Sequence, residues 1–214
     1  MKFKFLNLLF TGAIILLSNL ANAGLMSRLG GLAYYDDVAD LTWLTDANYA
    51  KTSGYSLDGR LSWVDANSWA ASLSVGGNDN WRLATTLQFD ASCNTQTSDP
   101  YGSYGDWCTG SEMGSLFYTA LGNVTGLATT YLDNKGPFNN IQYDTYWTAT
   151  QASSSNTLAF NMGNGRTEFD NMVTRSYAWA VQSGDVAKEV PEPSTLAIFV
   201  LGFIGLASRR FKKH

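Results

Sequence analysis

Histidine is nearly missing from this sequence of 214 residues, because its single occurrence is His214, the last residue. Glutamate is scarce as well: Glu112 and Glu168 are the two that fall between Gly24 and Asp185. Without an internal histidine, no histidine-dependent general base or catalytic triad can be built. A glycosidase needs two carboxyl groups, and nothing in the sequence pairs an acid with a base. We therefore expect a protein that is not an enzyme.

Positive charge is sparse in the middle of the chain. Between Gly24 and Pro193 there are eight Lys plus Arg against eighteen Asp plus Glu, a net charge of 8 − 18 = −10. The whole chain has a net charge of −4, because the remaining basic residues lie at its two ends. Binding to nucleic acid needs cations that displace phosphate counterions, and adhesion to anionic lipid needs a basic surface. The acidic middle segment argues against both kinds of partner.

Cysteine occurs twice, at Cys93 and Cys108. We expect the two to form a disulfide, which suits an oxidising compartment. It would close a loop of about fifteen residues, which on the chain-entropy model is worth about 3 kcal/mol. Two free thiols or a metal pair are the alternatives. A metal would need two further ligands, and no histidine lies nearby.

The first 23 residues have the pattern of a secretory signal peptide. Its parts are a basic start at Lys2 and Lys4, an apolar run over 5–17, and a small-residue cleavage site at Ala21 and Ala23. We expect export, cleavage after Ala23, and a mature chain that begins at Gly24. The alternative is an uncleaved membrane helix.

The C-terminal segment combines three features. They are the motif Val190, Pro191, Glu192 and Pro193, an apolar run over 194–208, and a tail over 209–214 that contains Arg209, Arg210, Lys212 and Lys213. As a helix, the apolar run would reach roughly 22 Å, whereas the hydrocarbon core of a bilayer is about 30 Å thick. The run is therefore too short for a comfortable permanent anchor.

This arrangement resembles a PEP-CTERM sorting signal. Such signals are recognised in Gram-negative bacteria by exosortases, which act as transpeptidases or proteases. The resemblance implies a precursor held in the inner membrane by a transmembrane segment over 194–208, with 209–214 cytoplasmic and the body periplasmic, as the positive-inside rule also expects. Cleavage near the Pro-Glu-Pro motif would leave the mature protein at the cell envelope or outside the cell. A plain single-pass anchor is the alternative.

Two helices are predicted in the body. Ser62 is a good N-cap, an acidic residue stands three positions later, and Gly76 with Gly77 ends the segment. The second helix begins after Ser111 as N-cap and ends at Gly122, which suits a left-handed stop.

Short strands make up most of the rest of the body. Alternation and β-branched or aromatic content predict strands over 146–150, 158–162, 166–169 and 177–181, the middle two as a hairpin. Helices early and strands late indicate one α+β domain over 24–185, followed by a linker over 186–193.

The body resembles the Lcl C-terminal domain family. The matching pieces are Leu41-Thr42-Trp43, Ser62-Trp63-Val64-Asp65-Ala66, Asn80-Trp81-Arg82-Leu83-Ala84-Thr85, Tyr146-Trp147-Thr148-Ala149-Thr150 and Tyr177-Ala178-Trp179-Ala180-Val181. The resemblance implies a C-type-lectin-like fold, related to that of formylglycine-generating enzymes. Some members bind sulfated polysaccharide, but this acidic body lacks the cations for that ligand.

Aromatic residues gather in the loop that ends at Cys108. Tyr101, Tyr104 and Trp107 stand among glycines, where they cannot share one face of a helix or strand, and Asp106 lies beside them. We predict a glycan-binding site here, because aromatic faces stack on the CH faces of sugar rings while polar side chains bind hydroxyls. The disulfide would pin the loop and lower the entropy lost on binding. The alternative is that the rings fold back onto the core.

Other candidate residues have plainer interpretations. Most of the remaining tryptophans are expected in the core: Trp43, Trp63, Trp69, Trp81, Trp147 and Trp179. Arg82 is expected to pair with an aspartate or to cap backbone carbonyls. We expect no cofactor. Asn78 and Asp79 are weak candidates for a calcium site, since Asn-Asp-Asn after two glycines is also typical of a turn.

Three functional hypotheses follow from these features. The first is a non-enzymatic binding module that contacts polysaccharide in exopolysaccharide or biofilm. The second is a structural matrix protein without a specific ligand, in which the loop aromatics are buried. The third is a carbohydrate-active enzyme, with two carboxyl groups roughly 5–10 Å apart in a cleft.

Overall fold

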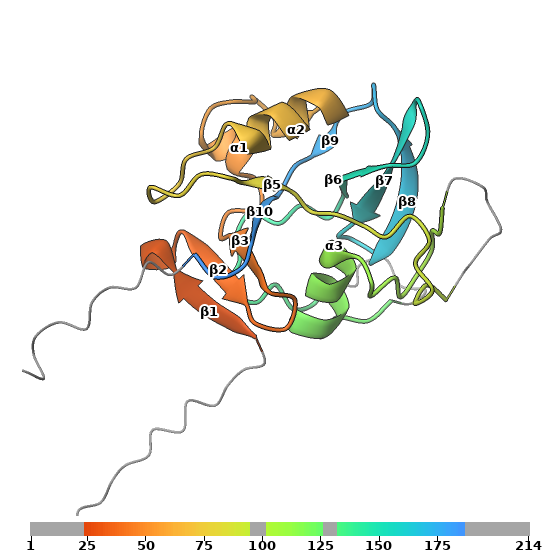
Figure 1. Cartoon of the computed structure of the whole chain (residues 1–214), viewed down its shortest axis with the longest axis horizontal. Helices are drawn as coiled ribbons and strands as arrows, with labels where there is room; N and C mark the ends of the chain where they lie inside the picture. Colours follow the sequence, from red (N-terminus) through yellow and green to blue (C-terminus); the bar gives the residue numbers. More distant parts are fainter. Residues whose placement is uncertain (1–23, 95–101, 126–131, 187–214) are drawn as a thin grey trace, which may run out of the picture.

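The computed structural model describes residues 24–94, 102–125 and 132–186 (Figure 1). The predicted signal peptide over 1–23, the predicted sorting motif, the apolar run and the basic tail lie outside the described residues, as does Tyr101. Within the described ranges, no helix is both long and apolar enough to cross a membrane.

Two five-stranded sheets form the body, in agreement with the predicted α+β class. The first sheet consists in spatial order of β1 (Leu25–Arg28), β2 (Ala33–Asp36), β3 (Leu41–Leu44), β10 (Ala180–Ser183) and β5 (Arg82–Leu83), and runs from the lower left of Figure 1 to the middle of the body. The second consists of β4 (Arg60–Leu61), β9 (Ser176–Tyr177), β6 (Thr145–Gln151), β7 (Asn156–Asn161) and β8 (Arg166–Asn171). Neighbouring strands are antiparallel in both sheets, except that β6 and β9 run parallel. The expectation that all strands pair in antiparallel fashion is therefore wrong for β6 and β9.

The described helices are all short. They are η1 (Leu29–Gly31), α1 (Tyr49–Thr52), α2 (Trp63–Ala71), α3 (Glu112–Gly114) and the π-helical turn η2 (Ser115–Ala120). Two helical segments were predicted, at α2 and at α3 with η2. The sequence patterns did not predict η1 or α1, because a single turn leaves little periodicity to detect.

The first predicted helix is confirmed as α2. The Ser62 hydroxyl accepts a hydrogen bond from the backbone N–H of Asp65 at 3.3 Å and donates one to the Asp65 carboxylate at 2.7 Å. Ala66, Trp69 and Ala70 form its buried face. This face lies over β4, β5 and β6, so the helix joins elements of both sheets.

The second predicted helix begins at its expected cap, since the Ser111 hydroxyl accepts a hydrogen bond from Gly114 N–H at 2.9 Å. It widens into η2, where Leu121 N–H reaches back five residues to the carbonyl of Leu116. Because of this wider turn, the helix buries Phe117 as well as its neighbour Leu116. Gly122 follows with a φ of +66°, as the predicted left-handed stop requires.

The hairpin of β7 and β8 is confirmed, and so is strand β6. The predicted strand over 177–181 is wrong as a single element, because the chain leaves the second sheet after Tyr177 and enters the first at Ala180. Trp179 lies at this crossing and is fully buried. Its indole N–H donates to the carbonyl of Leu44 at 2.7 Å, and its ring packs against Trp43 with centroids 5.4 Å apart. The change of sheet therefore coincides with a fully buried indole.

The tryptophan prediction is confirmed for most positions. The buried side chains are those of Trp43, Trp69, Trp81, Trp147 and Trp179. Trp63 is half-buried and donates its indole N–H to the carbonyl of Thr148 at 2.8 Å. Five buried indoles in one small body give it a large apolar core.

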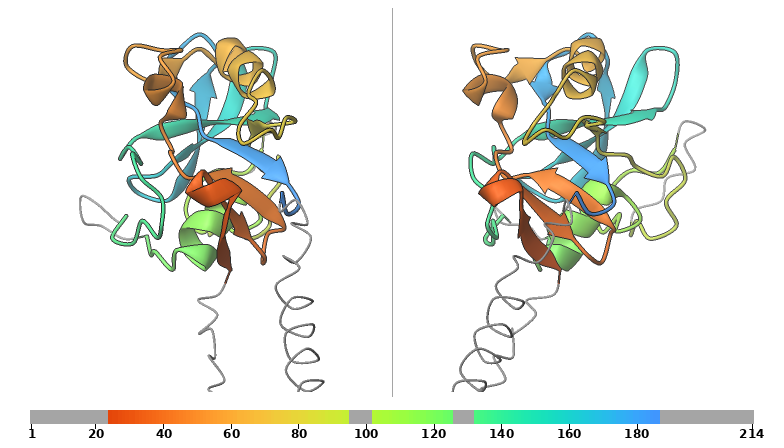
Figure 2. Two further views of the ribbon diagram at one scale, coloured as in Figure 1. Left: turned by 90° about the vertical axis from the view of Figure 1, so that its left-hand side faces the viewer. Right: turned by 60° about the vertical axis from the view of Figure 1, so that its left-hand side comes forward.

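The start of β1 and the end of β10 lie at the same end of the body (Figure 2). Arg28 on β1 holds Asp185 with two hydrogen bonds of 2.6 Å, one from Nε and one from Nη2. Thr42 donates its hydroxyl to the carbonyl of Gly184 at 2.7 Å. The two ends of the described body are therefore tied together.

Candidate functional site

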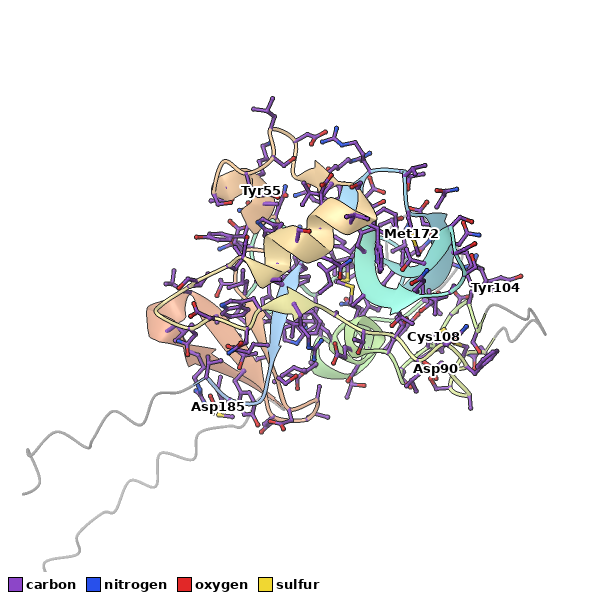
Figure 3. The ribbon with its side chains drawn as sticks, turned by 45° about the horizontal axis from the view of Figure 1, so that its top comes forward. Tyr55, Asp90, Tyr104, Cys108, Met172 and Asp185 are labelled. Carbon is purple, nitrogen blue, oxygen red and sulfur yellow. A yellow bond between two sulfur atoms is a disulfide. The ribbon has the colours of Figure 1, made fainter. Side chains whose placement is uncertain are left out.

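The predicted disulfide between Cys93 and Cys108 is present. It lies in the part of the body that also holds Tyr104, on the side away from Asp185 (Figure 3). The loop that this disulfide closes contains the predicted glycan-binding residues. The contacts of their aromatic rings show whether the rings pack against the fold.

The aromatic rings of this loop pack against the body. Trp107 stacks on Tyr118, with ring centroids 4.7 Å apart and an interplanar angle of 17°. The backbone N–H of Trp107 also donates to the Tyr118 hydroxyl at 3.1 Å. Burial raises the pKa of Tyr118, so its phenol stays neutral and donates in turn to the carbonyl of Gly165. Tyr104 meets Phe169 edge to face, with centroids 5.1 Å apart.

Polar contacts fasten the same loop to β8. Gly105 and Thr167 exchange two backbone hydrogen bonds of 2.9 Å. Asp106 lies 3.4 Å from the guanidinium of Arg166 and accepts from the Thr125 hydroxyl at 3.2 Å. Of the predicted glycan-binding residues, the structure thus brings Tyr104, Asp106 and Trp107 onto neighbouring parts of the fold and gives each an intramolecular contact.

The weak calcium candidates lie in a turn. Asn78 exchanges backbone hydrogen bonds with Val75, and the carbonyl of Asp79 accepts from the side-chain amide of Gln182. Within the described ranges, one group of three metal-ligand side chains comes together elsewhere: Asp90, Cys93 and Cys108. Since the two sulfurs of that group are bonded to each other, neither is a thiolate ligand.

Arg82 pairs with a glutamate, so the prediction of an aspartate partner is wrong, whereas the alternative prediction of a contact with a backbone carbonyl is confirmed. Its guanidinium donates to both carboxylate oxygens of Glu112, at 2.7 and 2.8 Å, and to the carbonyl of Leu83 at 3.1 Å. Glu112 also accepts from Thr85 N–H at 2.6 Å. This bidentate geometry fixes one of the two glutamates of the body in a structural role.

A pocket of about 490 Å³ lies between β3, α1 and the segment at 139–140. A volume of this size falls within the range of about 300–1,000 Å³ typical of small-ligand sites. Polar and apolar side chains line it together. The apolar part consists of Gly31, Leu32, Leu44 and Val75, and the polar part of Thr45, Asp46, Tyr49, Thr52, Asn139 and Asn140.

The Asp46 carboxylate is the most constrained polar group of this pocket. One oxygen accepts from the backbone N–H of Asn48 at 2.9 Å. The other accepts from the Thr52 hydroxyl at 2.6 Å and from the Asn140 side-chain amide at 2.9 Å. With three donors around it, the carboxylate is held in one orientation while the pocket stays open.

Backbone pairing brings the two sides of the pocket together. Asn139 N–H donates to the carbonyl of Thr45 at 2.9 Å, and Ala47 N–H donates to the carbonyl of Asn139 at 3.0 Å. Asn140 then adopts a φ of +55°, a conformation that asparagine tolerates better than most residues. The half-buried Tyr49 completes the wall from the first turn of α1.

The sequence patterns did not reveal this pocket. Its two sides lie more than ninety positions apart, as the Asp46 to Asn140 contact at a separation of 94 residues shows. The available signal was an aspartate directly after a strand, followed by a tyrosine. Such a signal is too common to single out a site by itself.

A second hollow of about 420 Å³ lies beside β1. Its polar side chain Asn134 is engaged on both sides, since the amide donates to the carbonyl of Leu121 at 2.7 Å and the side-chain oxygen accepts from Gly136 N–H at 2.9 Å. Tyr34 and Thr119 line it as well, but unlike the pocket at Asp46 it has no charged side chain among the described residues of its lining.

The comparisons with known proteins bear on the C-terminal segment. A family model for the PEP-CTERM protein-sorting motif matches residues 189–213. This match supports an exported surface protein that is held transiently in the membrane and processed by an exosortase. No curated protein matches the chain, and no solved structure does either.

Proposed function

We propose that this exosortase-processed protein is a non-enzymatic module whose body binds neutral polysaccharide in the pocket between Asp46 and Tyr49. The leader over 1–23 exports it and is cleaved after Ala23. The body remains periplasmic in the precursor. Release near Pro191-Glu192-Pro193 delivers it to the envelope or the extracellular matrix.

The observation that carries this proposal is the pre-oriented carboxylate of Asp46 in a pocket that Tyr49 also lines. A sugar ring presents a CH face that packs on an aromatic ring, while its hydroxyls donate to a carboxylate. A carboxylate that is already fixed loses little entropy when it binds. Leu32 and Leu44 supply apolar surface next to these groups.

The charge of the body favours a neutral polysaccharide over an anionic one. The segment between Gly24 and Pro193 has a net charge of −10 from 8 basic and 18 acidic residues, and Asp46 adds a negative charge inside the pocket. A sulfated or uronate-rich chain would be repelled. We also propose that the body has the C-type-lectin-like fold that its sequence resemblance implies. Such a fold is consistent with a sugar ligand.

We also propose that the body has no catalytic activity. In support, the Glu112 carboxylate accepts hydrogen bonds from Arg82 and from the backbone N–H of Thr85. A glycosidase would need that group or another to act as acid or nucleophile.

The test is binding of the full chain, in detergent, to a glycan array that includes the exopolysaccharide of the host, with and without calcium. Tyr49→Ala should lower the affinity at least about tenfold, equivalent to about 1.4 kcal/mol. Tyr55→Ala is the matched control, because this exposed tyrosine lies six positions further along the chain and does not line the pocket. Equal affinities of both variants would refute the pocket assignment. Binding to none of the glycans would favour the structural matrix protein instead.

A further inference from the structure

Asp36, the last residue of β2, has a buried carboxyl group without a full set of partners. Its side chain has no exposed surface. One oxygen accepts backbone hydrogen bonds from Val38 at 3.0 Å and from Ala39 at 3.2 Å. The other oxygen, Oδ2, is buried and has no hydrogen-bond partner within the described part of the chain. An ionised carboxylate in this position is costly unless a cation meets it.

The neighbouring charged side chains do not supply that cation. Arg28, on the paired strand β1, is bound to Asp185 and lies over the ring of Tyr35. The charges that remain near this edge are those of Asp37 and Asp40, which are negative as well, and Asp40 accepts a hydrogen bond from the Tyr35 hydroxyl. Burial and the charge of Asp37 both raise the pKa of Asp36, against the backbone hydrogen bonds that lower it.

Gly24 stands directly beside this carboxylate. A Cβ atom built on Gly24 would lie 3.3 Å from Asp36 Oδ1 and 3.2 Å from Asp37 Oδ1. The nitrogen and a Cβ atom on the same Cα are about 2.5 Å apart. The Gly24 nitrogen therefore lies within about 6 Å of Asp36 Oδ1.

The position of Gly24 is fixed by the sheet. Its carbonyl accepts from Asp37 N–H at 2.9 Å, and Leu25 is in register with Asp36. The φ of Gly24 is +103°, which a residue with a side chain rarely adopts. The nitrogen at this position is thus held within about 6 Å of the Asp36 carboxylate before any cleavage takes place.

We propose that cleavage after Ala23 creates an ion pair between the new α-ammonium group of Gly24 and the carboxylate of Asp36, so that leader removal itself stabilises the body. Water adds across the Ala23–Gly24 peptide bond. The leader leaves with a carboxylate, and the freed amine of Gly24 takes up a proton. This inference rests on the proposed export through a leader that ends at Ala23.

The pH dependence of stability differs between the uncleaved protein and the protein cleaved after Ala23. Before cleavage, the raised pKa of Asp36 means that its protonated form stabilises the fold, and this contribution is lost as pH rises through the folded pKa. After cleavage, the ammonium group favours the carboxylate. The stabilisation is then present near neutral pH, lost in acid when Asp36 is protonated, and lost in base when the α-amine, with an ordinary pKa of about 7.7–8.0, is deprotonated.

The experiment compares two chains in detergent, one from Gly24 to His214 and one from Asn22 to His214, each freed from a fusion without extra residues. The two additional residues move the ammonium group by up to about 7 Å. At pH 7 the chain that begins at Gly24 should melt about 5–10 °C higher. Asp36→Asn should lower its melting temperature, but should leave that of the longer chain unchanged or raise it. Asp37→Asn changes the exposed neighbour whose carboxylate lies equally near Gly24, and a greater loss for the chain that begins at Gly24 than Asp36→Asn causes would assign the ion pair to Asp37 and overturn the proposal.

Equal melting temperatures of the two chains, or an equal effect of Asp36→Asn on both, would overturn the ion pair. Should Asp36→Asn fail to fold, acylation of the α-amine by acetic anhydride provides a second measurement. It should be at least about tenfold slower for the chain that begins at Gly24, because an ion-paired ammonium is a poor nucleophile. Sequencing the N-terminus of the protein exported by its host separates the two proposals. A start other than Gly24 would refute the leader site, whereas the melting experiment tests the ion pair in either case.

Discussion

Two regions of the body carry aromatic and acidic side chains together, and they use them differently. In the loop that the disulfide closes, Trp107 lies on Tyr118 and Tyr104 meets Phe169, while Asp106 pairs with Arg166. In the pocket at the end of β3, the Asp46 carboxylate is oriented by its neighbours, and an open volume of about 490 Å³ remains next to it.

The difference shows that the residue types in a segment do not by themselves distinguish a ligand-binding surface from a loop that packs against the fold. Both regions contain Tyr, Asp and Gly or Asn within a few residues. In the loop, the rings find partners on β8 and η2, so their contact area stabilises the fold. In the pocket, hydrogen bonds within the protein fix the polar groups without filling the space in front of them. Three variants test how the loop and its surroundings contribute to the fold.

Removal of the disulfide should have the largest effect on stability. Cys93→Ser combined with Cys108→Ser should lower the free energy of unfolding by about 3 kcal/mol, because the loop in the unfolded chain is no longer closed. Urea unfolding followed by tryptophan fluorescence measures this loss. Glycan affinity should change less than about twofold, since the pocket lies outside the loop. A complete loss of glycan binding in a variant that still folds would place the site at the loop instead.

Truncation of the stacked ring should have the next largest effect. Trp107→Ala should cost about 2 kcal/mol, less than for a fully buried indole because Trp107 is half-buried. Trp107→Phe keeps a ring on Tyr118 and serves as the matched control, with most of the stability retained. If Trp107→Ala leaves the urea midpoint unchanged, the ring is not part of the fold and would be free for a ligand.

The smallest of the three effects concerns Glu168 on β8, next to the loop. Burial raises the pKa of Glu168, against the lowering influence of Arg166 and of hydrogen bonds with Asn164, Asn161 and Thr145. Its contribution to stability is therefore greatest below the unfolded pKa of glutamic acid, about 4.3, and is lost as pH rises through the folded pKa.

Melting temperatures measured at pH 4 and pH 7 check this. Relative to Glu168→Gln, the parent protein should be less stable at pH 7 than at pH 4, by less than the effect of Trp107→Ala. A parent protein that instead gained stability over this range, relative to the variant, would show that Arg166 outweighs burial.

Local patterns in the sequence were enough to predict much of the fold. The cap at Ser62 predicted α2, the alternating segments at 158–162 and 166–169 predicted the β7–β8 hairpin, and the presence of two cysteines in an exported chain predicted the disulfide. Each depends on residues close together in the chain, or on a pair with one plausible partner.

Apart from the single turns η1 and α1, the main features that were missed depend on contacts between distant segments. The split between β9 and β10 lies at Trp179, which is buried where the chain passes from one sheet to the other, and the partner of Arg82 is thirty residues away at Glu112. The pocket requires Asn140 to reach Asp46 across 94 residues. Local patterns such as periodicity and helix caps carry no information about contacts between distant segments. The pocket could therefore be identified only from the tertiary structure.

The most direct test of the pocket assignment is a calorimetric titration with exopolysaccharide purified from the host. It compares the parent chain with Tyr49→Ala in the pocket and Tyr104→Ala in the loop. We expect saturable binding by the parent chain, a loss of at least about tenfold for Tyr49→Ala, and a change below about twofold for Tyr104→Ala. The reverse order of the two variants, or no saturable binding by the parent chain, would contradict the assignment.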